Sequence, residues 1–291
     1  MQGHKVRVLD NNSRGRVSRI SDIYKDIEFL EGDIRSEFQV SKALKGTDAV
    51  VHLAYINGTE NFYLNPREVL EVGIEGMQNL VTGINANDIS EFYLASTSEV
   101  YQKPRIFPTP EDIQLVVPDP FNPRYSYGLG KILQEFMTIH FLPKVEKRII
   151  FRPHNIYGID MGWQHVIPEL FQKISACDQD GIFLKGDGTQ LRSFCHIDDF
   201  VQGFNLLLSS KFSGTEVVNV GSPIETSILD LATLIAMTLG RDVIFHKGPL
   251  PSGETDRRVP DLSKLVAAGY SPKVSLGEGI ANYREWFCKV K

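Results

Sequence analysis

Ala49-Val50-Val51-His52-Leu53-Ala54 is an almost entirely apolar run of strand length. An uninterrupted run of this kind is typical of a parallel strand that helices cover on both faces. Similar short runs precede and follow it, and they alternate with segments of helical periodicity. Strands are predicted at residues 5–10, 27–33, 49–54, 91–96 and 148–152, and helices at 66–85 and 127–141. This alternation predicts an α/β fold built on a doubly wound parallel sheet.

The pattern loosens in the second half of the chain. Residues 1–158 are expected to form a Rossmann-like domain, and residues 159–291 a smaller lobe from which some segments return to the first domain. In this lobe we predict helices at 167–174, from 198, at 227–239 and at 276–288, a strand at 216–220 and a hairpin-like segment at 181–187.

Composition excludes several classes of function. The 31 basic and 36 acidic residues give a formal net charge of −5, which argues against a nucleic-acid-binding face. The three cysteines have no metal-ligand spacing, so no metal site is predicted. No apolar run approaches the roughly 18 residues of a membrane-spanning helix, and no signal peptide follows Met1. A soluble, cytoplasmic protein with free thiols is expected.

Tyr127-Gly128-Leu129-Gly130-Lys131 opens the second long helix and supports hydride transfer with a nicotinamide cofactor. A phenol has a pKa near 10 and is a poor base at neutral pH. A lysine one helical turn later favours the phenolate and lowers that pKa. Thr97 lies at the end of the strand predicted upstream of this helix. Tyr125 and Tyr101 are alternative bases, but neither has a lysine four residues later.

Six phrases, in this order, resemble the extended short-chain dehydrogenase/reductases, and within them the NAD-dependent epimerases and dehydratases of nucleotide sugars. They are Gly3-His4-Lys5-Val6-Arg7-Val8-Leu9-Asp10, Glu31-Gly32-Asp33-Ile34-Arg35, Ser96-Thr97-Ser98-Glu99-Val100-Tyr101, Tyr127-x-x-x-Lys131, Arg152-Pro153-His154-Asn155-Ile156-Tyr157-Gly158 and Gly186-Asp187-Gly188-x-x-x-Arg192-Ser193-Phe194. The resemblance implies an NAD-binding domain over 1–158, a mainly substrate-binding lobe over 159–291, and a nucleotide-sugar substrate.

In that family a central strand and a glycine-rich turn precede the phrase found here at residues 3–10. The turn normally receives the cofactor's pyrophosphate, and the chain does not contain it. We therefore expect the first strand of the fold to be missing and its two neighbours to be unpaired. A misassigned start and a genuine truncation both explain this. A truncated, non-catalytic protein that binds nucleotide sugars is an alternative to an enzyme.

The resemblance also assigns residues to the cofactor. Asp10 is expected to accept hydrogen bonds from the adenosine ribose, and a carboxylate there favours NAD over NADP. Asp33 and Ile34 resemble the pair that holds the adenine ring. The full set of expected cofactor-binding residues is Asp10, Asn11, Ser13, Asp33, Ile34, Leu53, Ala54, Tyr55, Ser96, Tyr127, Lys131 and His154.

The substrate contacts are expected mainly in the second half of the chain. Arginine guanidinium groups suit the oxygens of a diphosphate. By resemblance the expected substrate-binding residues are Thr97, Ser98, Asn155, Val166, Arg192 and Arg258.

The overall reaction depends on the step after oxidation at C4 of the sugar. Return of the hydride to the other face gives 4-epimerisation, loss of water gives a 4,6-dehydratase, and loss of a C6 carboxylate gives a decarboxylase such as one acting on UDP-glucuronate. Glu99 is the discriminating residue, because several dehydratases and decarboxylases of the family carry Thr-Ser-Glu here and an epimerase needs no such acid. A structural hydrogen bond is the alternative role for Glu99. The expected catalytic residues are Tyr127, Lys131, Thr97 and Glu99. We favour the 4-epimerase narrowly. By resemblance, a homodimer is expected through the helices 66–85 and 127–141.

Overall fold

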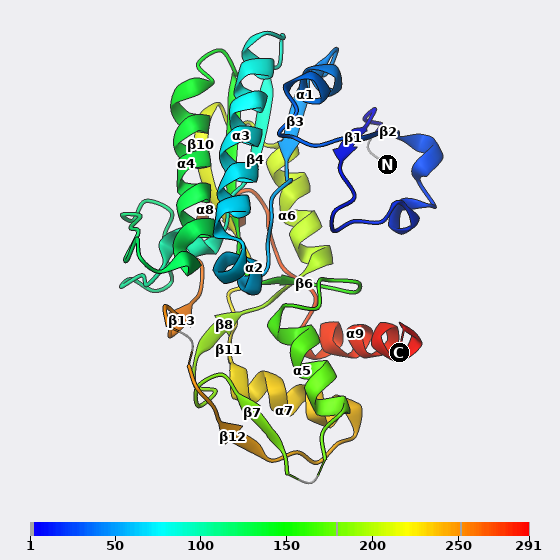
Figure 1. Cartoon of the computed structure of the whole chain (residues 1–291), viewed down its shortest axis with the longest axis vertical. Coiled ribbons are helices and arrows are strands. Elements are labelled where there is room, and N and C mark those ends of the chain that lie inside the picture. The colour runs from blue at the N-terminus through cyan, green and yellow to red at the C-terminus, as the bar shows by residue number, and fades with distance from the viewer. Residues whose placement is uncertain (1–2, 179, 251, 291) are drawn as a thin grey trace.

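The computed structural model describes residues 3–178, 180–250 and 252–290, which form a larger and a smaller lobe (Figure 1). A four-stranded parallel sheet lies at the centre of the larger lobe. Its strands are β3 (Ala49–His52), β4 (Glu91–Ala95), β5 (Lys147–Pro153) and β10 (Gly214–Val220), in the order β10-β5-β4-β3. The predicted α/β fold with a parallel sheet is therefore confirmed.

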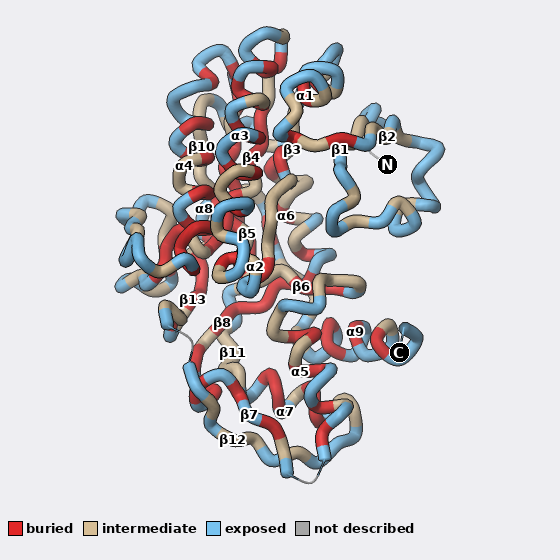
Figure 2. Tube along the Cα trace, viewed as in Figure 1, coloured by how far each residue is buried: buried red, intermediate tan, exposed pale blue. Residues whose placement is uncertain are grey.

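Alternate side chains of the central strands enter two different hydrophobic cores. Phe92 and Leu94 face one core, and Tyr93 between them faces the other. Because successive side chains of a strand point to opposite faces, helices must cover both sides of the sheet. The first face is covered by α1 (Glu37–Leu44), α3 (Pro66–Asn85) and α4 (Ser126–Phe141), and the second by α6 (Ile197–Ser209) and α8 (Ser263–Ala267). Figure 2 shows the buried central strands inside these helices.

The first two strands, β1 (Arg7–Asp10) and β2 (Glu28–Glu31), pair only with each other. They form a separate parallel ribbon that lies beside the main body (Figure 1). The expected break between β1 and β3 is confirmed, since β3 is an edge strand of the central sheet and Leu53 beyond it is 62% exposed. The Arg7 guanidinium holds the ribbon to the end of α1 by hydrogen bonds of 2.8 and 2.7 Å to the carbonyls of Ala43 and Lys45.

The smaller lobe is built around α5 (Val166–Ser175), α7 (Ile228–Leu239) and α9 (Leu276–Val290), whose apolar faces share one core. Its short strands are β6 (Ile156–Tyr157), β7 (Ile182–Leu184), β8 (Leu191–Ser193), β9 (Cys195–His196), β11 (Glu225–Ser227), β12 (Phe245–Lys247) and β13 (Arg257–Arg258). The hairpin-like pairing predicted at 181–187 is wrong. Strand β7 pairs in parallel with β12 instead, and a parallel partner must come from a distant part of the chain.

Short elements lie beyond the carboxyl ends of the central strands in the larger lobe. They are α2 (Thr59–Leu64) and the 3₁₀ turns η3 (Ser98–Tyr101) and η4 (Pro123–Tyr125); two more turns, η1 (Val17–Ile20) and η2 (Tyr24–Asp26), lie between β1 and β2. Thr97 and Tyr127 lie at this edge, where ligands of open α/β sheets bind. Among the described residues, no helix is both long and apolar enough to cross a membrane.

Candidate active site

Tyr127 and Thr97 meet at the carboxyl edge of the sheet. Thr97 follows β4 and caps η3, where its hydroxyl accepts a 3.1 Å hydrogen bond from the Glu99 amide. Tyr127 lies in the first turn of α4 and is 7% exposed. Burial raises the pKa of the Tyr127 phenol to about 12, although a hydrogen bond with Thr97 opposes this shift. The phenol is therefore protonated at neutral pH, and it needs a nearby positive charge to act as a base.

Lys131 lies one turn further along α4 and is 2% exposed. Burial lowers the pKa of its ammonium group to about 7, and the charge of Glu135 opposes the shift. Nζ donates hydrogen bonds of 2.7 Å to the Ala95 carbonyl and 3.0 Å to Gln134 Oε1. Neither bond goes to Tyr127. The structure thus brings the two motif residues into the same site without a direct contact between their polar atoms.

Two aromatic rings cover Tyr127. Phe62 of α2 stacks on it with ring centroids 4.6 Å apart and an interplanar angle of 8°. Tyr55 meets it edge to face, with centroids 5.2 Å apart. Both contacts are geometries that aromatic pairs prefer, so this cover is a packed part of the fold.

A second group of predicted residues lies on the β1–β2 ribbon. The Asp10 carboxylate is exposed at the end of β1 and accepts a 2.7 Å hydrogen bond from the Asn12 amide. The Asn11 side chain donates a 3.1 Å bond to Asp33, and Ser13 is exposed beside them. The pKa of Asp33 is held low by hydrogen bonds from Arg35. Carboxylate acceptors at the end of such a strand suit ribose hydroxyl groups, so these residues fit the adenosine end of NAD.

Other predicted cofactor residues lie outside the β1–β2 ribbon, and several of them are buried in the larger lobe. Ile34 is 8% exposed and packs against Gly76 of α3, while Leu53 and Ala54 lie just beyond β3. Ser96 is buried and donates a hydrogen bond to Glu135. His154 is fully buried beside Asn219, and burial lowers its pKa to about 3. The cofactor contacts of these residues stay predictions.

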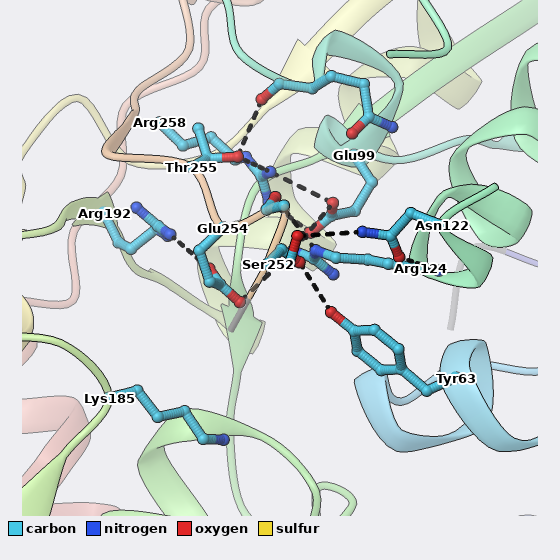
Figure 3. A network of polar contacts seen from close by, with 12 residues as sticks. Tyr63, Glu99, Asn122, Arg124, Lys185, Arg192, Ser252, Glu254, Thr255 and Arg258 are labelled. Carbon is cyan, nitrogen blue, oxygen red and sulfur yellow. Dashed lines mark hydrogen bonds and ion pairs between the residues drawn. The ribbon is translucent and has the colours of Figure 1, made fainter. Parts of the chain in front are cut away.

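Three buried guanidinium groups and two partly buried carboxylates form a cluster beside η3 (Figure 3). Arg258 binds Glu99 through both carboxylate oxygens, at 2.6 and 3.3 Å. Arg192 contacts the Glu254 carboxylate at 3.3 Å. Arg124 lies between the two acids, 3.7 Å from Glu99 and 3.6 Å from Glu254. This arrangement leaves one surplus positive charge in a site where ion pairs are poorly screened.

Glu99 is locked in this cluster as a carboxylate. Burial alone would raise its pKa, but the charges of Arg258 and Arg124 lower it to about 2. A carboxyl group with such a pKa is ionised at any physiological pH, so it carries no proton that it could donate as a general acid.

Of the substrate residues predicted from sequence, Arg192 and Arg258 belong to this cluster and Ser98 is adjacent in sequence to Glu99. Asn155 has a positive φ of 42° and donates a 2.9 Å hydrogen bond to the Ser193 carbonyl. Ser98 is 4% exposed in η3, and Val166 begins α5. Sequence reasoning missed Arg124, Glu254 and Tyr63, whose hydroxyl donates a 3.0 Å bond to the Ser252 carbonyl. Arg124 could have been found from its place three residues before Tyr127, whereas Glu254 has no local signal.

The low pKa of Glu99 makes a testable prediction about stability. The folded pKa lies below the ordinary value of 4.5, so the stabilisation is complete above that value and is lost as pH falls toward about 2. We expect Glu99→Gln to lower the free energy of unfolding at neutral pH and to flatten its decline in acid. Urea unfolding between about pH 6 and about pH 3 measures this. Exposed Asp88→Asn is the control, and an equal acid slope in wild type and Glu99→Gln would contradict the prediction.

Comparison with known proteins gives a consistent set of relatives. The model of the family described as "NAD dependent epimerase/dehydratase family" matches residues 1–221. UDP-glucuronic acid decarboxylase 1 of Danio rerio is 29% identical over 99% of this chain and 68% of its own length. UDP-N-acetyl-alpha-D-glucosaminuronate decarboxylase of Bacillus cytotoxicus is 28% identical over 100% of this chain and 92% of its own.

The fold is also found among solved structures. The UDP-glucose 4-epimerase of Thermotoga maritima, in complex with UDP-glucose, superimposes with a TM-score of 0.85 at 26% identity. The alignment covers 99% of this chain and 92% of the other.

Proposed function

This chain belongs to the NAD-dependent epimerase/dehydratase family, and we propose that it is a nucleotide-sugar 4-epimerase acting through a 4-keto intermediate. The family and the relatives support NAD-dependent modification of a nucleotide sugar. The choice of epimerisation depends on one observation. Glu99, the one residue assigned to a second acid/base step, is held as a carboxylate by Arg258 and Arg124.

In this proposal Tyr127 takes the proton of the C4 hydroxyl group, and bound NAD supplies the hydride acceptor. Thr97, whose hydroxyl group hydrogen-bonds the Tyr127 phenol, is placed to hydrogen-bond the same oxygen. The Lys131 ammonium stabilises the phenolate once it approaches Tyr127. After the keto sugar turns over, C4 takes the hydride back on its opposite face and Tyr127 returns the proton to the C4 oxygen. Epimerisation therefore needs only these residues, and Glu99 can remain paired throughout.

A second candidate function is decarboxylation of a nucleotide hexuronate. The surplus positive charge of Arg124, Arg192 and Arg258 favours it, because a buried guanidinium suits a C6 carboxylate as well as a diphosphate. The likeness to two decarboxylases supports the same reading.

Chromatographic separation of the products, followed by their mass, distinguishes the candidates in one assay. The purified chain is supplied with NAD and incubated in separate reactions with UDP-glucose, UDP-glucuronate and each of their N-acetyl analogues. A new stereoisomer of unchanged mass supports the 4-epimerase. Loss of carbon dioxide from a uronate supports the decarboxylase, and loss of water contradicts both proposals.

We also propose a homodimer in which α3 and α4 of each subunit pair. The outer faces of these helices carry large exposed apolar side chains: Ile74 is 36% exposed, Leu129 42% and Phe136 53%. Because α3 and α4 pack against each other, these side chains lie on one helix pair, and exposed apolar surface there is a candidate interaction site. We expect Phe136→Glu to convert a dimer to a monomer on size-exclusion chromatography with light scattering. Met237→Glu, at a 73% exposed position on α7, is the control, and a variant Phe136→Glu that stays dimeric would contradict this interface.

A further inference from the structure

Tyr55 occupies a slot that depends on two glycines. Its ring lies between α3 and α4, and a Cβ atom added at Gly73 or at Gly130 would overlap the Tyr55 hydroxyl group. Both glycines are buried within their helices. Because any larger residue at either position would close the slot, the helix pair is shaped to receive this phenol.

The Tyr55 hydroxyl group is buried in this position and makes no hydrogen bond in the part of the chain that the structure describes. Burial raises its pKa, so the group stays a neutral phenol. A buried hydroxyl without a partner carries its full desolvation cost. The ring contacts, and not the hydroxyl group, must therefore keep Tyr55 in the slot.

Those ring contacts involve both motif residues. Lys131 Nζ lies over the face of Tyr55, 4.1 Å from the ring centroid, and the Tyr127 ring meets Tyr55 edge to face at 5.2 Å. Each of the two residues thus packs on Tyr55, while no hydrogen bond joins them among the described residues. A cation–π contact and an edge-to-face contact are comparable in size to the cost of one buried hydroxyl. Tyr55 therefore stays in the slot through its ring contacts, at the cost of one hydroxyl group left unpaired among the described residues.

We propose that Tyr55 is a positioning residue that holds the Lys131 ammonium away from the Tyr127 phenol until its ring leaves the slot. The inference depends on the proposed function in that it treats Tyr127 and Lys131 as the reacting pair. Two conformations result, one with the ring in the slot and the pair separated, and one with the ring outside and the pair joined. Any change that stabilises the first conformation lowers the population of the second, relative to the first, by the same factor.

Tyr55→Phe tests this balance, because it removes the buried hydroxyl group and keeps the ring. We expect a higher midpoint of thermal unfolding together with a kcat/KM and an NAD affinity that are each about 5-fold to 100-fold lower, as expected from the cost of a buried hydroxyl. A gain in stability with a loss of function is the result that a purely structural role does not produce. A more stable variant with unchanged NAD affinity, or a less stable variant, would overturn the proposal.

Tyr283→Phe is the matched control. The Tyr283 hydroxyl group in α9 is likewise buried without a partner among the described residues, and it lies in the core of the smaller lobe. We expect this variant to be more stable and to have unchanged NAD affinity and turnover.

A readout without turnover separates this proposal from the proposed function. In protein labelled with carbon-13 at the lysine Cε, nuclear magnetic resonance follows the titration of Lys131, assigned with Lys131→Met. The titratable groups that face it are His52 and Glu135. Tyr55→Ala uncovers the ammonium group, and because burial is the main cause of the low Lys131 pKa, that pKa is expected to rise toward its ordinary value, whereas Tyr55→Phe should retain it. No change in Tyr55→Ala would refute the packing. If no nucleotide sugar is turned over, this titration and NAD affinity still decide the role of Tyr55.

Discussion

Replacing Tyr127 by phenylalanine is expected to lower kcat about 10²-fold to 10⁴-fold, the range for losing a positioned acid/base group. The variant keeps the aromatic contacts with Phe62 and Tyr55, because both involve the ring and not the hydroxyl group. Its loss of stability should be small, about 1 kcal/mol, which is typical of one hydrogen bond such as that with Thr97. Steady-state kinetics and urea unfolding measure the two effects.

Two other tyrosines serve as controls for this assignment. Tyr101 cannot take the proton from a substrate in this structure, because its buried hydroxyl group donates to Asn219 Oδ1 at 2.7 Å and accepts from Arg152 at 2.8 Å. Tyr125 lies in η4, beside the Gly253 segment. We expect Tyr125→Phe to retain turnover within about tenfold of wild type, an acid/base loss below the usual range. A larger loss of turnover in Tyr125→Phe than in Tyr127→Phe would show that Tyr125, and not Tyr127, is the base.

The sequence predicts the central fold because the deciding signals are local. Apolar strand runs and helical periodicity lie within single segments, and the observed bounds of β4 and α4 differ from the prediction by one residue. The break between β1 and β3 was also predictable, since family strands pair in a known order. The wrong pairing at 181–187 has the opposite origin, because β7 and β12 lie some 60 residues apart and only tertiary packing joins them.

The same distinction applies to the site. Tyr127 and Lys131 form a spacing motif, so they can be found without a structure, but their separation by Tyr55 depends on a slot between two helices. The state of Glu99 depends on Arg258, which lies 159 residues later in the chain. The residues of such a charge cluster do not recur at a fixed spacing in the sequence, so no pattern reveals them. Residue types were therefore predictable, whereas their protonation and pairing were not.

Beneath the site, Glu135 and Arg152 form an ion pair that we expect to be essential for stability. Arg152 donates two hydrogen bonds to Glu135, of 2.9 and 2.7 Å, and both side chains are about 5% exposed. Burial alone would lower the pKa of Arg152, but the bonds to Glu135 raise it above its ordinary value. The pair joins α4 to β5, and Ser96, next to Thr97, donates to the same carboxylate.

Glu135→Gln keeps the shape of this side chain and removes its charge. The Arg152 charge is then buried without a counter-ion, so the free energy of unfolding should fall by about 3–5 kcal/mol. Because Glu135 also opposes the low pKa of Lys131, that pKa should fall further, and less of Lys131 is charged at neutral pH. The matched control is Glu225→Gln, which breaks the bidentate pair with the 42% exposed Arg257 and should cost less than about 1 kcal/mol. Urea unfolding of both variants decides the matter, since equal losses would show that burial does not set the strength of the Glu135–Arg152 pair.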